Sequence, residues 1–154
     1  MNETACCFTG HRKLEPQIIP ALEKNLRDAI ENLIHSGVIH FLAGGALGFD
    51  TLAARTVLSL KELHPEIRLN LVLPCREQTQ HWPPQDADGY QEILSRADTV
   101  LYTSEHYCRG CFHIRNRYLV DHSGYCIYHL TSHTGGTAYT VEYASQKGLV
   151  LLSV

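Results

Sequence analysis

The sequence lacks an excess of charge of either sign. Its 154 residues carry a formal net charge of −3 at pH 7, and no run of lysine and arginine is longer than the pair Arg12 and Lys13. A protein that binds nucleic acid through the phosphate backbone usually presents a basic face. The charge balance therefore argues against nucleic acid as a partner, although it is compatible with a local basic patch.

Long apolar segments are also missing. No stretch approaches the roughly 20 apolar residues that a helix needs to span a bilayer, and the N-terminus has no basic segment followed by an apolar one, the pattern of a secretory signal. We therefore expect a cytoplasmic protein without a membrane partner. Thiols stay reduced in the cytoplasm, so the six cysteines need not form a disulfide framework.

The composition is that of an ordinary globular domain. Apolar residues make up 44% and charged residues 19% of the chain, which argues against disorder. A chain of this length can bury one core, and we find no repeat, low-complexity segment or linker. We expect one domain that covers residues 1–154.

Short apolar runs alternate with segments of helical periodicity. The runs predict six strands, at 4–8, 38–43, 67–73, 98–102, 124–130 and 149–154. The periodicity predicts five helices, at 18–34, 52–60, 90–97, 112–121 and 141–144, and the polar stretch 75–88 is predicted to be a loop. Such alternation is typical of a parallel sheet with right-handed crossovers. We predict an α/β fold: a single Rossmann-like three-layer domain with a mainly parallel sheet and helices on both faces.

Three glycine-bearing turns stand where an apolar run should lead into a helix. They are Thr9-Gly10-His11-Arg12, Gly44-Gly45-Ala46-Leu47-Gly48 and Thr134-Gly135-Gly136-Thr137. Glycine lets the backbone approach a ligand closely, and a helix N-terminus offers unpaired N–H groups with a partial positive charge. Together, at one edge of a parallel sheet, these turns predict a pocket for an anion such as a phosphate.

The first turn supplies three candidate ligand contacts. Gly10 opens the turn, Thr9 offers a hydroxyl group, and Arg12 offers a fork of N–H donors that matches a phosphate. The alternative is a tight turn with an exposed arginine.

The second turn supplies Gly44, Gly45 and Gly48, which would bring backbone N–H groups to the ligand. Asp50 follows them, and its carboxylate could accept a hydrogen bond from a ribose hydroxyl. Equally, Asp50 could complement the dipole of the helix that begins there.

The third turn places Gly135, Gly136 and Thr137 at the start of the last predicted helix. Thr134 and Thr137 are candidates for the N-cap of that helix or for phosphate contact, and a ligand can replace the cap. The alternative is a simple strand-to-helix turn.

These motifs resemble a known group. The segment from Gly44 to Asp50, the pair Arg115-Asn116 followed by Asp121, and the last glycine turn are similar to the pattern of the DprA-type Rossmann-like proteins, while Thr9-Gly10-His11-Arg12 resembles the YpsA-like branch. The enclosing superfamily is SLOG, named after its Smf/DprA and Lonely Guy members. The resemblance implies a Rossmann-like sheet that binds a nucleotide or nucleotide-derived ligand, with Arg115 and Asn116 among its contacts. The fingerprint G-x-G-x-x-G of dinucleotide-dependent dehydrogenases is absent.

An enzyme is the first alternative. The segment around Arg115 also resembles the Lonely Guy phosphoribohydrolases, which cleave the base–ribose bond of nucleoside monophosphates. That resemblance implies Arg115 and Glu142 as the catalytic pair, with Glu142 stabilising positive charge on the sugar. The sequence departs from that family where Ala138 and Tyr139 replace its Gly-Thr.

Two further features have open interpretations. Cys108 and Cys111, with His106 and His113 nearby, have a spacing compatible with zinc, but a structural site needs four ligands and no second Cys-x-x-Cys is present. We therefore predict no metal site. Trp82, in the polar stretch, would either stack on a base or anchor its loop.

The sequence as a whole predicts a binder of a nucleotide or a nucleotide-derived small molecule, of the NAD or ADP-ribose kind, that acts as a sensor or regulatory module. We expect no required cofactor. The alternatives are the N-glycosidase and, by analogy with DprA, binding of single-stranded DNA. Rossmann-like relatives often pair through a helical face, so a homo-oligomer is compatible with the sequence.

Overall fold

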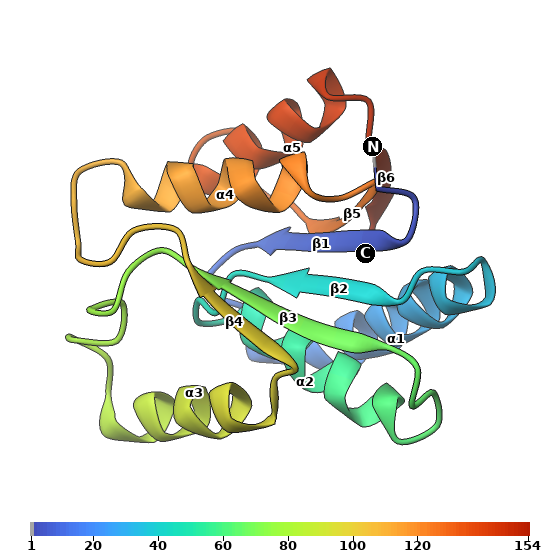
Figure 1. Cartoon of the computed structure of the whole chain (residues 1–154), viewed down its shortest axis with the longest axis horizontal. Coiled ribbons are helices and arrows are strands. Elements are labelled where there is room, and N and C mark those ends of the chain that lie inside the picture. The colour runs from blue at the N-terminus through green and yellow to red at the C-terminus, as the bar shows by residue number, and fades with distance from the viewer. Residues whose placement is uncertain (1) are drawn as a thin grey trace.

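The computed structural model describes residues 2–154, which form one three-layer α/β unit (Figure 1). Six strands make one sheet: Ala5–Gly10 (β1), His40–Ala43 (β2), Arg68–Leu73 (β3), Thr99–Tyr102 (β4), Tyr125–His129 (β5) and Val150–Ser153 (β6). The helices between them are Ile19–His35 (α1), Phe49–Lys61 (α2), Pro84–Arg96 (α3), Cys111–Asp121 (α4) and Gly136–Gln146 (α5), with a short 3-10 helix, Pro16–Ile18 (η1), before α1.

The strand order is β4-β3-β2-β1-β5-β6, and each neighbouring pair is parallel. The chain first builds the sheet outward from β1 to β4, and then crosses to the other side of β1 to add β5 and β6. The direction of winding therefore switches between β1 and β5. At such a switch the connections leave on opposite faces of the sheet, and a crevice opens outside the carboxyl ends of the strands.

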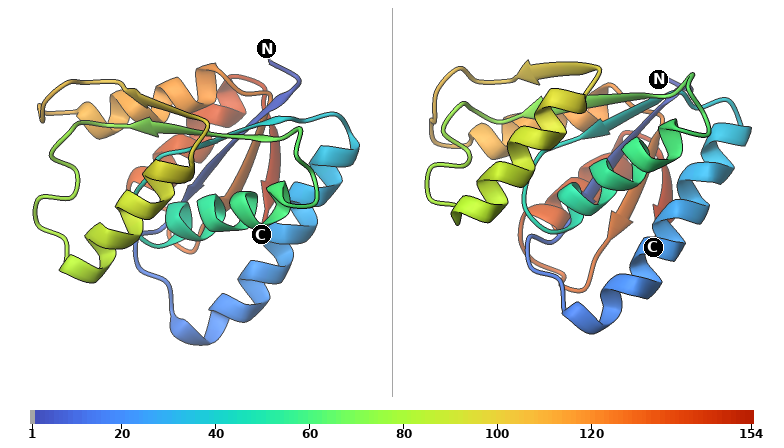
Figure 2. Two further views of the ribbon diagram at one scale, coloured as in Figure 1. Left: turned by 60° about the horizontal axis from the view of Figure 1, so that its bottom comes forward. Right: turned by 90° about the horizontal axis from the view of Figure 1, so that it is seen from below.

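Helices cover both faces of the sheet, which confirms the predicted three-layer Rossmann-like fold. Figure 2 shows α1 (blue), α2 (green) and α3 (yellow-green) across one face, and Figure 1 shows α4 and α5 together on the other. The described part of the sheet is parallel throughout, where a mainly parallel one was expected.

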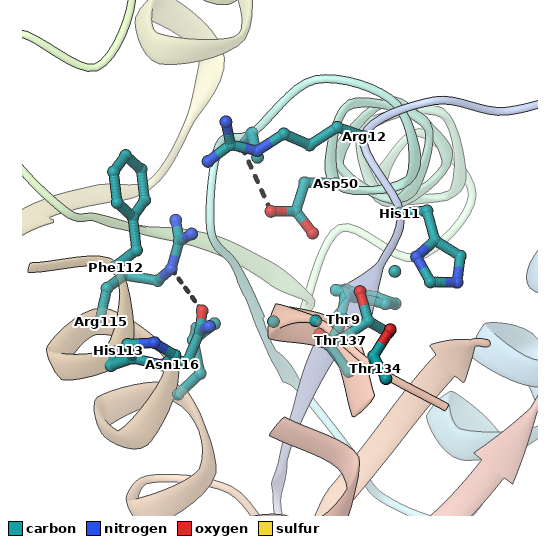
Figure 3. A pocket seen from close by; sticks show the side chains of 16 residues that line it. Thr9, His11, Arg12, Asp50, Phe112, His113, Arg115, Asn116, Thr134 and Thr137 are labelled. Carbon is teal, nitrogen blue, oxygen red and sulfur yellow. Dashed lines mark hydrogen bonds between the residues drawn. The ribbon is translucent and has the colours of Figure 1, made fainter. Parts of the chain in front are cut away.

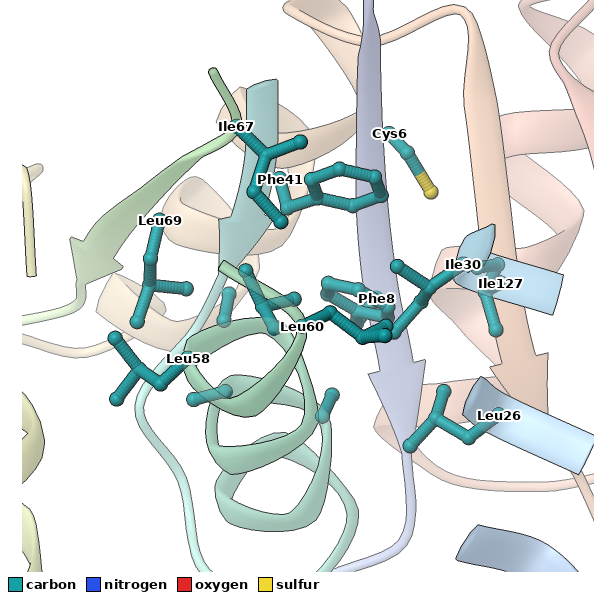
Figure 4. Close-up of a cluster of buried hydrophobic side chains, with 14 of the residues drawn as sticks. Cys6, Phe8, Leu26, Ile30, Phe41, Leu58, Leu60, Ile67, Leu69 and Ile127 are labelled. Carbon is teal, nitrogen blue, oxygen red and sulfur yellow. The ribbon is translucent and has the colours of Figure 1, made fainter. Parts of the chain in front are cut away.

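The core under α1, α2 and α3 is the larger of the two. Alternate residues of the central strands point into it, including Phe8 and Phe41, whose rings stack with centroids 6.1 Å apart (Figure 4). The intervening residues, such as Cys7 and Leu42, pack on the opposite face against α4 and α5. This alternation explains why the strands read as short continuous apolar runs, since both of their faces are buried.

One predicted boundary is wrong. The stretch 75–88 was predicted to be a loop, but α3 begins at Pro84 and includes the end of that stretch. Proline is favoured in the first turn of a helix because its missing N–H has no intrahelical partner there. The first turn is also polar, with Asp86 in it, so apolar periodicity could not reveal it.

The predicted end of the first helix is confirmed. Ser36 caps α1, and Gly37 follows with φ of 100°, the left-handed conformation that glycine adopts readily after a helix. Within residues 2–154, none of the helices has both the length and the apolar character needed to cross a membrane.

Candidate functional site

A cavity of about 390 Å³ lies at the carboxyl end of β1, beside the turn that follows β5 (Figure 3). Four segments far apart in the sequence line it: residues 8–12 at the end of β1, the start of α2, the inner face of α4, and residues 134–137 before α5. The cavity therefore occupies the switch point of the sheet, where open parallel sheets bind their ligands.

Arg115 brings a buried positive charge to this cavity. Its side chain is only 4% exposed and lies on the inner face of α4. Its Nη1 donates a hydrogen bond to the carbonyl of Gly44, and its Nε donates one to Asn116 Oδ1 at 2.7 Å. Burial lowers the pKa of the guanidinium from its ordinary value, yet arginine stays protonated in proteins. The cavity wall thus holds a fixed cation in a defined orientation.

Asp50 places a carboxylate beside that cation. It lies in the first turn of α2, is 7% exposed, and its Oδ2 accepts a hydrogen bond from the backbone N–H of Ala46 at 3.2 Å. Burial raises the pKa of Asp50, and the nearby charge of Arg115 opposes that shift. Since Asp50 lines the cavity, it offers acceptor oxygens to a hydroxyl group of a ligand.

Arg12 adds a second, exposed guanidinium at the mouth of the cavity. Its Cζ lies 5.0 Å from the centroid of the Phe112 ring, and Cζ of Arg115 lies 5.8 Å from the same centroid. Such distances allow cation–π attraction. Phe112 therefore holds two positive charges close to one cavity, which favours an anionic ligand.

The N-terminus of α5 closes the cavity on the other side. Gly135 occupies the N-cap position with φ of 99°, and no side chain caps the helix. Thr137 lines the cavity and is 8% exposed. Within the described chain, a Cβ built on Gly135 or Gly136 would meet nothing within 4 Å. The first turn of α5 is thus open beside the cavity, and the unpaired N–H groups of a helix N-terminus favour anions.

The glycines of the other two turns pack against protein instead. A Cβ on Gly10 would overlap the ring of Phe49, and one on Gly44 would come within 2.6 Å of Nη1 of Arg115. Gly48 has φ of 73°, and its missing Cβ makes room for the backbone carbonyl of Arg12. These glycines let the first and second turns approach each other and Arg115.

The structure brings most of the predicted ligand residues together. Those that line the cavity are Thr9, Gly10, Arg12, Asp50, Arg115, Asn116, Thr134, Gly135, Gly136 and Thr137. Gly44, Gly45 and Gly48 lie outside the lining, although Gly44 accepts the hydrogen bond from Arg115. Glu142 is exposed on α5 and also lies outside the lining.

Six residues of the lining were not predicted as ligand contacts: Phe8, His11, Ala46, Phe112, His113 and Leu119. The polar or aromatic ones, His11, Phe112 and His113, are within three positions of Gly10 or Arg115, and this proximity was their only signal in the sequence. His11 Nε2 accepts a hydrogen bond from the backbone N–H of Thr131 at 2.9 Å. Burial lowers the pKa of His11, and the neighbouring imidazole of His129 lowers it further. The neutral ring thus ties the end of β1 to the segment after β5.

Trp82 and the two cysteines lie outside the cavity, although His113 lines it. Trp82 packs edge-on against Tyr90, with ring centroids 5.4 Å apart, and contributes to the larger core, which supports its role as an anchor. Cys111 is buried at the start of α4, whereas Cys108 is exposed. In residues 2–154 no three His, Cys, Asp or Glu side chains are grouped in a way that could hold a metal ion.

Fold and cavity together define a Rossmann-like α/β protein with its candidate site at the switch point. Comparison with known families is more specific. The family model described as the YspA SLOG family matches residues 6–149, so the chain belongs to that SLOG family, as the motifs indicated.

Relatives in sequence extend over most of the chain. The UPF0398 protein BH1768 of Halalkalibacterium halodurans is 33% identical over 132 residues, which cover 84% of this chain and 70% of the relative. The SPbeta prophage-derived protein YoqJ of Bacillus subtilis is 28% identical over 138 residues, 81% of each chain.

Solved structures of DNA processing protein A share the fold. The Helicobacter pylori protein superposes with a TM-score of 0.69 at 20% identity, over 99% of this chain and 65% of its own. The Streptococcus pneumoniae protein superposes with a TM-score of 0.68 at 18% identity, over 97% of this chain and 49% of its own. The chain therefore spans between half and two thirds of those proteins.

Proposed function

We propose that this protein binds a nucleotide or nucleotide-derived small molecule in the cavity at the switch point, and that it acts as a sensor or regulatory module. One observation carries the proposal: the uncapped, open N-terminus of α5 and the buried guanidinium of Arg115 line the same cavity. Both favour a negative charge: α5 has no side-chain cap, and Arg12 adds a second positive charge beside the pair that Arg115 forms with Asp50.

The arrangement supports one orientation of the ligand. A phosphate would accept hydrogen bonds from the N–H groups at Gly136 and Thr137, while a ribose hydroxyl would donate to Asp50. Arg12 and Arg115 would then stand near a second phosphate, which favours a ligand with two, such as an ADP-ribose or a dinucleotide. The cavity volume of about 390 Å³ lies at the lower end of the range for small-molecule sites, so part of such a ligand would extend past Arg12.

Thermal melting against a ligand panel tests the proposal directly. The panel contains NAD, ADP-ribose, AMP, ATP, cyclic dinucleotides and free phosphate. A ligand at 100 times its dissociation constant stabilises the folded state by about 2.7 kcal/mol, which gives a clear rise in Tm for a domain of this size. A selective rise supports the proposal, and the absence of a rise with every compound contradicts it.

A charge substitution then locates the ligand. Gly136→Asp places a carboxylate at the N-terminus of α5, where it complements the helix dipole but repels a phosphate. We expect the variant to fold and to lose ligand-induced stabilisation. Gln85→Asp is the matched control, because it adds the same charge to the exposed first turn of α3, away from the cavity. Equal ligand response in both variants would place the ligand elsewhere.

The N-glycosidase alternative depends on Glu142. Its carboxylate would have to reach the sugar, whereas Glu142 is exposed and outside the cavity lining. The test is release of free base from nucleoside monophosphates at high protein concentration. Release that is lost in Glu142→Gln would support the enzyme; no release would leave binding as the function.

Single-stranded DNA is the second candidate ligand. The Helicobacter pylori structure with the same fold is described by its single-stranded DNA binding mode, so the low net charge does not by itself dismiss nucleic acid. Phosphates of a strand would occupy the same cationic cavity. Binding to an oligonucleotide that weakens steeply with salt, and that Gly136→Asp abolishes, would favour DNA over a small molecule.

A further inference from the structure

The two edges of the sheet differ in what they expose. β4 pairs only with β3, and β6 pairs only with β5, so each leaves one row of backbone groups without a strand neighbour in the described chain. Figure 1 shows β4 in front of the sheet, with no element beyond it. A free edge is a template for pairing with another strand.

Exposed apolar side chains are frequent between β4 and the start of α4, and two of them, Leu101 and Ile114, line one groove. Of six large hydrophobic residues that are exposed in residues 2–154, four belong to the segment from β4 to the second turn of α4: Val100, Leu101, Tyr107 and Ile114. The other two are far from this group in the sequence: Leu63 follows α2, and Val150 begins β6. Clustered exposed apolar residues mark interaction surfaces.

A groove of about 480 Å³ runs between β4 and α4. Leu101 forms its floor, Ile114 and Tyr118 form its apolar wall, and Arg117 and Asp121 add one charge of each sign. Leu101 is 40% exposed, whereas Val72, its neighbour on β3, is 2% exposed on the same face. Helix coverage thus ends one strand short of the edge, although parallel sheets are normally covered on both faces.

β4 also lacks the features that protect natural edge strands. Its sequence, Thr-Val-Leu-Tyr, contains no charged residue and no proline. Natural edges are usually blocked by lysine, proline, a bulge or a covering loop. A strand that is apolar, uncharged and open on its edge is suited to pair with a partner strand.

We propose that two copies of this chain pair through β4, antiparallel about a two-fold axis, to continue the sheet across the interface. The register follows from the faces of the strand. Directly opposed residues of an antiparallel pair point to the same face, so Leu101 lies opposite Leu101 of the second copy, and Val100 lies opposite its Tyr102. Every opposed pair is then apolar or threonine, which makes the strand complementary to itself.

The charges of the groove agree with a second copy as the occupant. The two-fold axis brings the α4 groove of one copy against the same groove of the other. Because each groove carries Arg117 and Asp121, opposite charges are available across the axis and no net charge accumulates there. A strongly charged partner would meet no complementary surface at this edge.

The opposite edge, β6, also lacks a charged residue and proline and borders a groove of about 620 Å³ beside α1, but it exposes less apolar surface. Val150 is 50% exposed, but Leu151 and Leu152 of β6 pack against the smaller and the larger core respectively. α5 packs against β6 on one face (Figure 1), so Val150 is the one large apolar side chain of β6 that is exposed. β6 therefore provides the matched control.

Sedimentation equilibrium of the wild-type chain and two lysine variants tests the proposal. We expect a reversible dimer, and Leu101→Lys should raise its dissociation constant by at least about 100-fold, because two lysines would oppose each other at the axis. Val150→Lys, which adds the same charge at the other edge, should leave it unchanged. Melting curves of both variants verify that they fold. A monomeric wild type, or a dimer that Leu101→Lys leaves intact, overturns the proposal.

A cysteine cross-link tests the register. In a Cys108→Ser background, which removes the exposed thiol, Leu101→Cys should form a disulfide-linked dimer with oxidised glutathione, since residues opposed at the axis have Cβ atoms about 4.5–5.5 Å apart. Val150→Cys should not. Cross-linking at position 150 and not at 101 overturns the proposal in favour of the β6 edge.

Discussion

The two faces of the sheet differ in how completely their helices cover them. Under α1, α2 and α3, apolar side chains from β1, β2, β3 and β5 form one large continuous core. Under α4 and α5 the core is smaller, and the helices leave both the candidate cavity and the groove beside β4. The first face thus holds the larger core, with a groove only at its β6 border, while the second carries the candidate cavity and the groove beside β4.

This difference indicates where substitutions are tolerated without loss of the fold. A fully packed face transmits any loss of volume to the whole fold. The second face already contains open space, so substitutions there should alter binding before they alter stability.

Adjacent residues of β2 provide the first test. Phe41 is fully buried in the larger core, and Phe41→Ala should lower the free energy of unfolding by about 3–5 kcal/mol. Leu42 points to the other face, where it borders an open groove, so Leu42→Ala should cost only about 2 kcal/mol. Denaturant unfolding of both variants measures the difference. Equal losses would mean that the two faces are packed equally well.

Two glycines test the distinction between packing and binding turns. Gly48→Ala should destabilise the protein by at least about 2 kcal/mol, because φ is 73° and the new Cβ would overlap the carbonyl of Arg12. Gly136→Ala adds a Cβ in open space at a helical position, so it should be neutral or stabilise by up to about 1 kcal/mol. Thermal unfolding without ligand decides, and a destabilised Gly136→Ala would contradict the open turn.

Arg115→Lys separates binding from folding. A lysine keeps the charge but cannot donate to both Gly44 and Asn116 as the guanidinium does. We expect the compound that gives the selective rise in Tm to bind about tenfold more weakly, a loss of about 1.4 kcal/mol of binding free energy. Arg117→Lys is the control on the same helix, because Arg117 is exposed and outside the cavity. Calorimetric titration measures both, and equal affinities would remove Arg115 from the site.

The smallest effect is a pH dependence at Asp50. Burial raises its pKa above the usual 3.8, so the folded chain binds this proton more tightly than the unfolded chain. The stabilisation by this bound proton is therefore fully present below the unfolded pKa of about 4, and it is lost as the pH rises through the higher pKa of Asp50 in the folded protein. Asp50→Asn removes this loss, so its unfolding free energy relative to wild type should increase with pH across that window.

Asp98 provides a control of opposite sign. Burial alone would raise its pKa, but hydrogen bonds from Lys61 and from the backbone N–H of Leu69 lower it below the usual value. Its contribution to stability is present above the unfolded pKa and lost as pH falls. Asp98→Asn should therefore lose stability relative to wild type as the pH rises from about 3 to about 5, a window around the pKa of an unfolded aspartate. The same slope for both variants would contradict the assignment.

Much of the fold could be predicted from local patterns. The six strands and five helices were each identified. Buried parallel strands have short, continuous apolar sequences, and the helices that cover them have apolar residues at helical spacing. The start of α3 was missed because Asp86 and its polar neighbours carry no apolar signal. Local chemistry could mark Pro84 as a helix start, but only neighbouring elements decide whether a polar first turn folds there.

The candidate site could be predicted only in part. Turns at the ends of β1 and β5 were expected to meet, because parallel strands bring their carboxyl ends to one edge. Their distinct roles could not be predicted: Gly135 and Gly136 face open space, whereas Gly10 and Gly44 make room for Phe49 and Arg115. A glycine looks the same in sequence whether a ligand or a side chain fills the space beside it.

The alternation of strands and helices and the order of the glycine turns follow from the sequence alone, because they depend on local periodicity and backbone freedom. Tertiary contacts are needed to place β5 beside β1, to bring Arg115 to the carbonyl of Gly44 and to leave β4 uncovered. These are contacts between segments distant in sequence, and close packing of the whole chain selects them.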